Sequence, residues 1–254
     1  MRKAICLLLF ILVLCFAVMA NADEPQKVSV GDIITFGTYE QDNLTIFGPE
    51  PIEWIVLDVQ DGKALLLSRY GLYPKPYNTD WVYVTWEDCT LRTWLNDDFL
   101  NEAFNPEEQS SILITEVDNS DAQGFDWTTV EGDGTTGGNN TEDRIFLLSC
   151  AEADRYLGVK CHNIDAGDNV QSRVAPTKYA ISNRAFADYG DEDRAACKTS
   201  DGKRAGWWWL RSPGDYQANA AVVSQFGSFT TKYADNEFIC VRPALWVNLE
   251  LEIF

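Results

Sequence analysis

The sequence predicts a single α+β domain, mostly an antiparallel twisted sheet with a few flanking helices and long loops. Three observations lead to this prediction. Short apolar runs typical of strands alternate with turn residues, only a few segments combine helical spacing with a cap, and long stretches consist of Gly, Asp, Asn and Thr. With 46% hydrophobic and 13% aromatic residues, the chain can also bury a substantial core.

The start of the chain has the pattern of a secretory signal peptide. A short basic start precedes an apolar run over residues 4–18 that is short for a membrane span, and Ala20-Asn21-Ala22 matches a cleavage site. A lipid anchor would have to use Cys15, which follows a leucine and fits a lipobox poorly. Cleavage is therefore favoured over a lipid anchor or an uncleaved anchor. We expect residues 1–22 to be removed and residues 23–254 to form one domain that is secreted or displayed at the cell surface.

The mature chain is strongly acidic. Arg2 and Lys3 are the only charged residues in the predicted signal peptide, so their removal takes the formal net charge from −19 to −21. Such a chain repels phosphate backbones and anionic membrane surfaces, which argues against nucleic acid or lipid as a partner. No second apolar stretch is long enough for a spanning helix, so we expect no membrane insertion of the mature chain.

The first strands of the domain are predicted near the N-terminus. Residues 28–36 alternate well enough for a strand, which ends at Gly37. Two further strands, 52–59 and 64–68, flank the pair Asp61-Gly62, the strongest short-range hairpin signal. Both faces of these strands are largely apolar, so we expect helices to cover the sheet on both sides.

The helical cover is predicted to begin at Thr85. Thr85 and Asp88 have the spacing of a capping box, and apolar side chains then recur at helical spacing. Asn105 precedes Pro106 and two glutamates, which predicts the N-cap of a second short helix. Residues 112–117 are then typical of a strand.

The middle of the chain alternates polar loops with short elements. Residues 118–143 predict a long loop, which is usually functional or mobile but can be an insertion without a role. Residues 144–149 return to a strand pattern. Ser149 and Glu152 then have capping-box spacing and open a predicted helix over 150–157.

The C-terminal part is predicted to be mostly strand. Polar loops at 158–175 and 188–206 precede it, with a short helical segment after Pro176 between them. A type II turn is predicted at Ser212-Pro213-Gly214-Asp215, and a second turn at Gly227. The predicted strands cover 207–211, 220–223, 228–233 and 238–247.

Five cysteines remain after the predicted cleavage. Their number is odd, their spacings are wide, and the domain is large enough to fold without covalent links, so we expect buried free thiols with at most two bridges. Cys161 and Cys197 are the pair to test first, because both lie in polar, loop-like sequence. The five are Cys89, Cys150, Cys161, Cys197 and Cys240.

Few reaction centres fit this sequence. His162 is the only histidine, which excludes two-histidine metal motifs, and its neighbour Cys161 is awkwardly placed for a catalytic dyad. No C-x-x-C pair, glycine-rich phosphate loop or G-x-S-x-G elbow occurs. We assign no catalytic residue and no metal ligand, and no acidic pair stands out for glycoside hydrolysis.

Calcium is the one cofactor left open. The loops are rich in carboxylates, and calcium binds several oxygen ligands, but no D-x-[DN]-x-[DN]-G pattern occurs and acids in exported loops are usually only solvated. The loop acids considered are Asp118, Asp121, Asp126, Asp133, Asp143, Asp165 and Asp168.

The stretch GWWWLRSPG places three tryptophans in one predicted strand. Trp207 and Trp209 face one side of such a strand and Trp208 faces the other, so a sheet covered on both sides buries at least two of them. An exposed pair would instead form a binding platform. We expect Arg211 to be held by a carboxylate or by carbonyls, and it can stack on an indole.

Several motifs together resemble a bacterial exported-domain family of unknown function, over about Gly31 to Val247. More distantly, FLLSCAEADRYL resembles a segment of formylglycine-generating-enzyme-like domains. The order of the last strands resembles C-type-lectin-like domains, which implies a compact α+β fold whose long loops display a binding surface. The motifs that carry the first resemblance are IEWIVLD, ALLLSRY, TWEDCTLRTWLNDDFLNEAF, TEDRIFLLSCAEADRYL, WWLRSPG and VRPALWV.

The departures from these families limit what carries over. The calcium-binding tripeptides of lectins, E-P-N and Q-P-D, are absent, and no cysteine pair near the C-terminus matches the copper-binding pair of the formylglycine enzymes. Neither sugar specificity nor oxidase activity is therefore implied by the resemblance.

We expect a non-enzymatic module that binds an extracellular glycan or protein. An extracellular hydrolase that uses carboxylates on polysaccharide or peptidoglycan, and a structural domain of a surface assembly, are the alternatives. The ligand surface is expected near the loops 118–143, 158–175, 188–206 and 212–219. If a surface aromatic contributes, the candidate ligand-binding residues are Trp208, Arg211, Tyr216 and Asn219.

Overall fold

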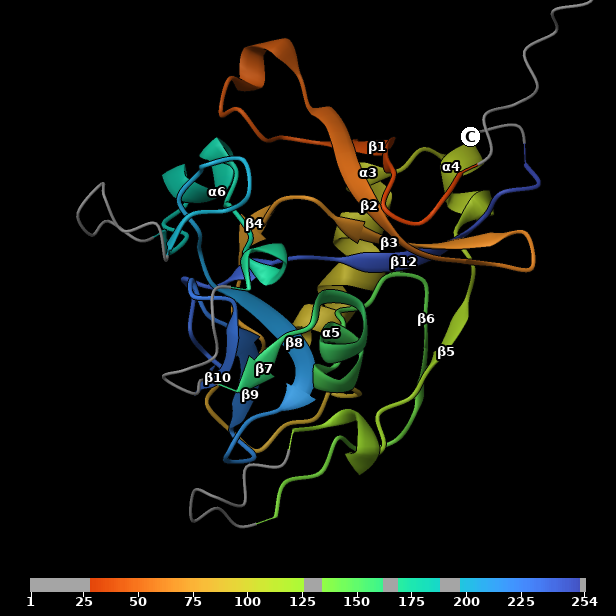
Figure 1. Ribbon diagram of the computed structural model, residues 1–254. Coiled ribbons are helices and arrows are strands. Elements are labelled where there is room, and N and C mark those ends of the chain that lie inside the picture. Colours follow the sequence, from red (N-terminus) through yellow and green to blue (C-terminus); the bar gives the residue numbers. More distant parts are fainter. Residues whose placement is uncertain (1–27, 126–133, 162–168, 188–196, 252–254) are drawn as a thin grey trace, which may run out of the picture.

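The computed structural model describes residues 28–125, 134–161, 169–187 and 197–251. The predicted signal peptide, His162 and four of the loop acids considered for calcium lie outside these ranges. The described chain has the predicted α+β class: short helices pack around curled, mostly antiparallel sheets (Figure 1). No helix in the described ranges combines the length and apolarity needed to cross a membrane.

The first sheet has the order β1-β2-β3-β12, and all its pairs are antiparallel. The predicted hairpin is confirmed, because β2 and β3 are joined by Asp61 and Gly62 with φ angles of 49° and 71°. Two successive positive φ angles suit the type I′ turn that matches strand twist. The strands are β1 Ile33–Tyr39, β2 Glu50–Gln60, β3 Lys63–Ser68 and β12 Ala244–Asn248.

The first strand differs from the prediction at both ends. It begins at Ile33 and continues past Gly37, where we expected it to stop. Gly37 has a φ of 67° and lies in a bulge between Thr35 and Thr38. A side chain there would lie 2.5 Å from the Phe104 ring, so glycine permits close packing of the helical layer instead of ending the strand.

The helical layer starts later than predicted. Cys89, not Thr85, caps the first helix, and its sulfur accepts a hydrogen bond from the Arg92 backbone at 3.4 Å. The preceding segment is held by a tertiary contact, because the Trp86 indole donates to the buried Asp143 carboxylate at 2.9 Å. The elements are α2 Thr90–Trp94, the π-helical turn η2 Leu95–Phe99, α3 Leu100–Ala103 and α4 Pro106–Ser111.

The second sheet has the order β4-β11-β8-β9-β10-β7. β8, β9 and β10 form an antiparallel meander, whereas β11 pairs with β8 and β7 with β10 in parallel. The strand predicted over 238–247 is divided between the two sheets, since β11 and β12 are separated at Arg242 and Pro243. The strands are β4 Tyr73–Pro74, β7 Lys160–Cys161, β8 Trp208–Pro213, β9 Asn219–Val223, β10 Ser228–Tyr233 and β11 Cys240–Val241.

The turn predicted at Ser212-Pro213-Gly214-Asp215 is wrong. β8 continues through Pro213, and Gly214 does not have the positive φ that a type II turn needs at its third position. Gly214 packs instead against Asn219 and Thr231 of the neighbouring strands, with 2.9 Å from its Cβ position to the Asn219 Cβ. The chain reverses one step later, where the Asn219 backbone donates to the Tyr216 carbonyl at 2.8 Å.

The remaining elements follow local signals to different degrees. The capping boxes at Asn105 and Ser149 are both formed, and α5 Cys150–Leu157 has the predicted bounds. The strand predicted over 112–117 shortens to β5, and 144–149 is not a regular strand but forms one bridge through Phe146. The other elements are η1 Thr45–Phe47, β5 Thr115–Val117, η3 Asp121–Gln123, β6 Thr141–Asp143, η4 Val170–Ser172 and α6 Lys178–Ser182.

Both sheets contribute to one buried hydrophobic cluster. All residues of β3 after Lys63 are buried, as expected for a strand covered on both faces. Cys89, Cys150 and Cys240 are buried free thiols, and burial raises the pKa of each to about 12. The Cys161 side chain lies outside the described residues, so its pairing with Cys197 stays a prediction.

Candidate functional site

The tryptophans of β8 lie inside the protein. Trp208 and Trp209 are fully buried and Trp207 is half-buried, which confirms that at least two of the three are covered. The Trp208 indole donates to the Ser172 carbonyl at 3.0 Å, and the Trp209 indole donates to the Lys75 carbonyl at 2.8 Å. Trp208 is therefore not a surface aromatic, and this candidate is corrected: β8 is a central strand whose two faces are both packed.

Arg211 is also inside, with 2% of its surface exposed. Its two terminal nitrogens bind both oxygens of Glu152 and the carbonyls of Leu147 and Asp118, and Nε donates to the Asn119 side chain. The predicted fixation by a carboxylate and carbonyls is confirmed, although the ring beneath the guanidinium is Phe146 and not an indole. All five N–H donors are used, so Arg211 has none to offer a ligand.

A small polar pocket lies beside Arg211 and is not large enough for an organic ligand. It encloses about 40 Å³ between the segments 119–125 and 135–137 and the end of β8. That volume holds a few water molecules. Asp121 is the single carboxylate among its described lining residues, so it offers no opposed acidic pair.

Exposed rings from segments far apart in the chain lie at one end of the second sheet, where β8 turns into β9 and where β10 ends. We call Trp81, Tyr83, Tyr216 and Tyr233 the aromatic face; between 37% and 64% of each residue is exposed. Trp81 packs edge-on against Tyr233 with ring centres 5.4 Å apart, and Tyr83 against Tyr216 at 5.1 Å. The two Tyr83 and Tyr216 hydroxyls are 2.6 Å apart and share a hydrogen bond.

Backbone pairing fixes the aromatic face in place. The segment that carries Trp81 and Tyr83 is tied at one end by Asn78, whose backbone donates to the Ala234 carbonyl at 2.9 Å. At its other end the Gln217 side chain donates to the Val84 carbonyl at 3.0 Å. The rings are thus presented by anchored backbone, which lowers the ordering cost of binding a ligand.

A polar group lies next to the face. The Asp215 carboxylate accepts hydrogen bonds from the Asn219 amide at 2.9 Å and from the Thr231 hydroxyl at 2.7 Å. The carboxylate fixes the direction of the Asn219 amide, since only its NH₂ group can donate. The side-chain oxygen Oδ1 of Asn219 is buried without a hydrogen-bond partner among the described residues.

Of the four predicted ligand residues, Tyr216 and Asn219 therefore lie together, while Trp208 and Arg211 belong to the interior. The sequence reasoning missed Trp81, Tyr83 and Tyr233. The run Trp81-Val82-Tyr83 offered a signal, because three large apolar side chains follow each other in a segment without helical or strand flanks.

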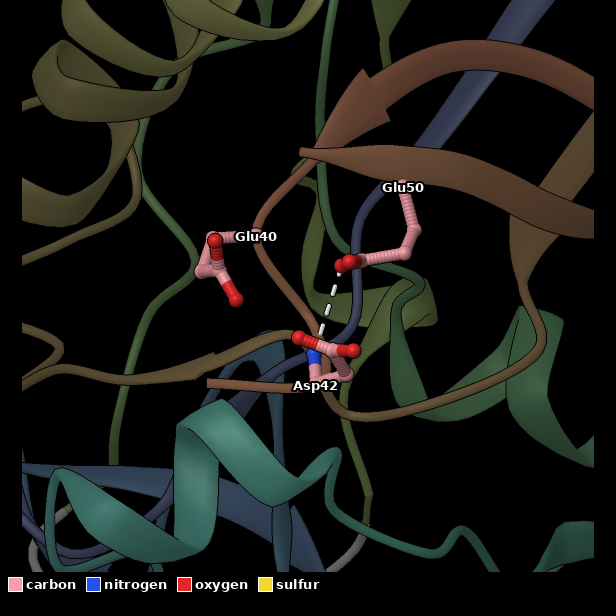
Figure 2. A group of neighbouring side chains, drawn as sticks. All are labelled: Glu40, Asp42 and Glu50. Carbon is pink, nitrogen blue, oxygen red and sulfur yellow. Dashed lines mark hydrogen bonds between the residues drawn. The ribbon is translucent and has the colours of Figure 1, made fainter. Parts of the chain in front are cut away.

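A carboxylate cluster closes the loop between β1 and β2. Each of Glu40, Asp42 and Glu50 places one oxygen within 4.8 Å of the others, and it is the one such set of three among the described residues (Figure 2). Glu50 accepts from the backbone of Asp42 at 3.2 Å, and Glu40 and Asp42 both accept from the backbone of Leu44. Calcium binds carboxylate oxygens of this type, but these carboxylates already accept hydrogen bonds from the backbone of their own loop.

The described loop acids considered for calcium do not form a comparable set. Asp143 is buried and binds the Trp86 indole, the Thr141 hydroxyl and the Arg92 guanidinium. Asp118 accepts from the Ser120 backbone and the Gln123 side chain, and these hydrogen bonds lower the pKa of its carboxyl.

A family model described as a domain of unknown function, DUF6273, matches residues 61–249. The chain belongs to this family. Comparisons with curated proteins and with solved structures found no match. The DUF6273 match begins later than the predicted span of 31–247. It contains the whole aromatic face, whereas Glu40, Asp42 and Glu50 precede it.

Proposed function

We propose that this DUF6273 protein is an exported, non-enzymatic binding module that holds a glycan chain against the aromatic face. The single observation that carries the proposal is the presence of four exposed rings in two edge-to-face pairs at one end of a sheet. A chain with this net charge rarely exposes several large aromatic side chains in one region unless they bind something.

The chemistry of the face suits a neutral sugar polymer. Aromatic rings have an electron-rich face that attracts the C–H groups on one side of a pyranose ring. The tyrosine hydroxyls and the second oxygen of the Asp215 carboxylate can bond sugar hydroxyls at the rim, since the Asn219 and Thr231 hydrogen bonds both go to Oδ1 of Asp215. The formal charge of −19 disfavours uronic acid or phosphate-containing polymers, because like charges repel.

The hydrolase alternative lacks a comparable site among the described residues. Glycoside hydrolysis needs two carboxyl groups roughly 5 to 10 Å apart across a cleft. In Glu40, Asp42 and Glu50 one oxygen of each lies within 4.8 Å of the others, which is closer than this, and backbone N–H groups of their own loop bond to one oxygen of each carboxylate. The pocket beside Arg211 offers one carboxylate. Binding is therefore the better supported function.

Two further parts of the proposal rest on the sequence. Export rests on the signal-peptide pattern of residues 1–22. A C-type-lectin-like arrangement rests on the order of the last strands and on the loops that follow them. In that arrangement the segment around Tyr216 belongs to the ligand surface.

The test is binding of the mature chain to a panel of insoluble and soluble glycans, including chitin, cellulose, xylan and peptidoglycan, with and without calcium. We expect Trp81→Ala and Tyr233→Ala to weaken binding at least tenfold. Phe226→Ala is the matched control, because Phe226 is an exposed aromatic outside the face. Equal binding by all variants, or no binding by the wild type, contradicts the proposal, and release of sugar fragments supports the hydrolase instead.

A further inference from the structure

The loop between β1 and β2 carries the most exposed apolar side chains of the described chain. Ile46 and Phe47 are 85% and 77% exposed, and both belong to the single turn η1. This loop projects beyond the body of the protein at the top of Figure 1. We call Ile46 and Phe47 the apolar knob.

The knob is held in a defined position. Gln41 links the two sides of the loop, since its backbone donates to Glu50 and its amide to the Pro51 carbonyl. The Tyr179 backbone at the start of α6 donates to the Gln41 carbonyl at 2.9 Å. The backbone thus holds two apolar side chains in water in a fixed position. Such an exposed apolar patch is typical of a contact site.

A groove with matching chemistry lies at the other end of β2. It has a volume of about 350 Å³, which is in the range of sites that take apolar groups. Leu113, Ile114 and Trp246 form its apolar surface, and Lys63 lies at its edge. Ile114 is 63% exposed, so the groove is accessible from outside.

Charge also matches between the two ends. Lys63 has no carboxylate partner among the residues that the structure describes. The knob is flanked by Glu40, Asp42 and Glu50, for which the described chain likewise offers no basic partner. When the knob enters a groove of this kind, the lysine meets the carboxylates.

The knob cannot reach the groove of its own molecule. β2 lies between the knob and the groove and has 11 residues. At the usual rise per residue its two ends are about 33 Å apart. In Figure 1 the loop between β1 and β2 is at the top and the turn between β2 and β3 is at the right-hand side. A second copy of the chain carries the same groove and can bring it to the knob, so we take a second copy as the partner.

We infer that copies of this protein associate head to tail, with the apolar knob of one copy in the Leu113–Ile114–Trp246 groove of the next. Because the two surfaces are different, a head-to-tail pair keeps one free knob and one free groove, and the assembly grows beyond a dimer unless it closes into a ring. This contact is independent of the aromatic face, which stays free to bind a ligand.

The association is expected to be weak and to depend on concentration. One turn of a loop in one groove buries far less than the roughly 1,600 Å² of a standard interface. The net charge of −19 on each copy also opposes approach. Longer assemblies are therefore expected where many copies are crowded together.

The test is sedimentation velocity on the mature chain over a range of concentrations. We expect the mean mass to rise past that of a dimer. Phe47→Ser removes the ring from the knob and Ile114→Glu places a charge in the groove. Both residues are exposed, so both variants should fold, and each alone should associate at least tenfold more weakly. Tyr233→Ala, in the aromatic face, should associate as the wild type does.

Mixing the two defective variants decides the geometry. The Ile114→Glu copy keeps a knob and the Phe47→Ser copy keeps a groove, so the mixture should form dimers that grow no further. A wild type that stays monomeric at its highest soluble concentration overturns the inference. So does dimer formation by either variant alone at wild-type strength, because the contact then does not need both the knob and the groove.

Discussion

The tryptophans of β8 and the rings of the aromatic face are similar side chains, yet their surroundings differ: β8 is a central strand of the six-stranded sheet, whereas Tyr233 is the one residue of the aromatic face that lies in a strand of that sheet. Trp208 and Trp209 are fully buried, and each indole N–H is bonded to a backbone carbonyl. Trp81 and Tyr233, in the aromatic face, are 56% and 60% exposed. Ring content alone therefore says little about binding; coverage by neighbouring elements separates rings that stabilise the fold from rings that are free to contact a ligand.

The largest expected effect is the loss of a buried ring. Trp208→Ala should lower the free energy of unfolding by about 3–5 kcal/mol, because it leaves a cavity and an unpaired Ser172 carbonyl. Urea denaturation measures the change. Trp81→Ala is the matched control and should stay within about 0.5 kcal/mol of the wild type. Similar losses in the two variants would remove the distinction between the regions.

A somewhat smaller loss is expected for Arg211→Met. The substitution leaves the Glu152 carboxylate and two carbonyls without their donors, and breaking a buried pair costs about 3–5 kcal/mol. The Glu152 side chain is 29% exposed, so water recovers part of this and we expect a loss of about 2–3 kcal/mol. Adding Glu152→Gln should restore part of the stability. A double variant that is less stable than the single one would contradict this account.

Alkaline pH should weaken the interior through its thiols. Burial raises the pKa of Cys240 to about 12, whereas the unfolded thiol ionises near its ordinary value of 9.0. Between pH 9 and pH 12 the Cys240 thiol is ionised in the unfolded chain and protonated in the folded chain. The free energy of unfolding therefore keeps its full value below pH 9 and falls as the pH rises above 9. Each thiol contributes about 1.4 kcal/mol per pH unit. Cys240→Ala should reduce the slope of unfolding free energy against pH above 9, and an unchanged slope would refute the assignment.

The smallest effect is expected for Arg242, which is also a buried arginine. Arg242 is 1% exposed, donates through Nε to the Ser68 carbonyl and stacks on Trp208, but Nη1 has no partner among the described residues. Burial without a counter-charge lowers its pKa to about 9. Arg242→Met keeps the stacking volume and removes a costly charge, so stability should change by less than about 1 kcal/mol. A loss as large as that of Arg211→Met would show that Arg242 has a stabilising partner.

Local patterns predicted those elements whose signals are complete within a few residues. The Asp61-Gly62 hairpin, the caps at Asn105 and Ser149 and the bounds of α5 all follow from such signals. The predictions failed where distant residues decide. Asp143 binds Trp86, and the segment that looked like a helix start at Thr85 stays outside the helix.

The candidate site was only half accessible to sequence reasoning. Tyr216 and Asn219 could be proposed from their turn, but their partners lie far away in the chain: Tyr83 and Tyr216 are 133 positions apart. Trp208 and Arg211 are close to Tyr216 and Asn219 in the sequence, but in the structure they lie in the core. Adjacency in the chain does not reveal which strand ends are covered.

The sequence by itself determined the α+β class, the capped helices, the tight hairpin and the burial of most of the β8 tryptophans, because propensity, capping and hydrophobic patterning act over short distances. Only the tertiary structure decided which aromatic side chains meet in the aromatic face, where the apolar knob and the groove are placed, and that Arg211 is bonded to Glu152 whereas Arg242 has no carboxylate partner among the described residues. These features depend on contacts between segments that are far apart in the chain, and a ring is exposed or buried according to whether another segment covers it.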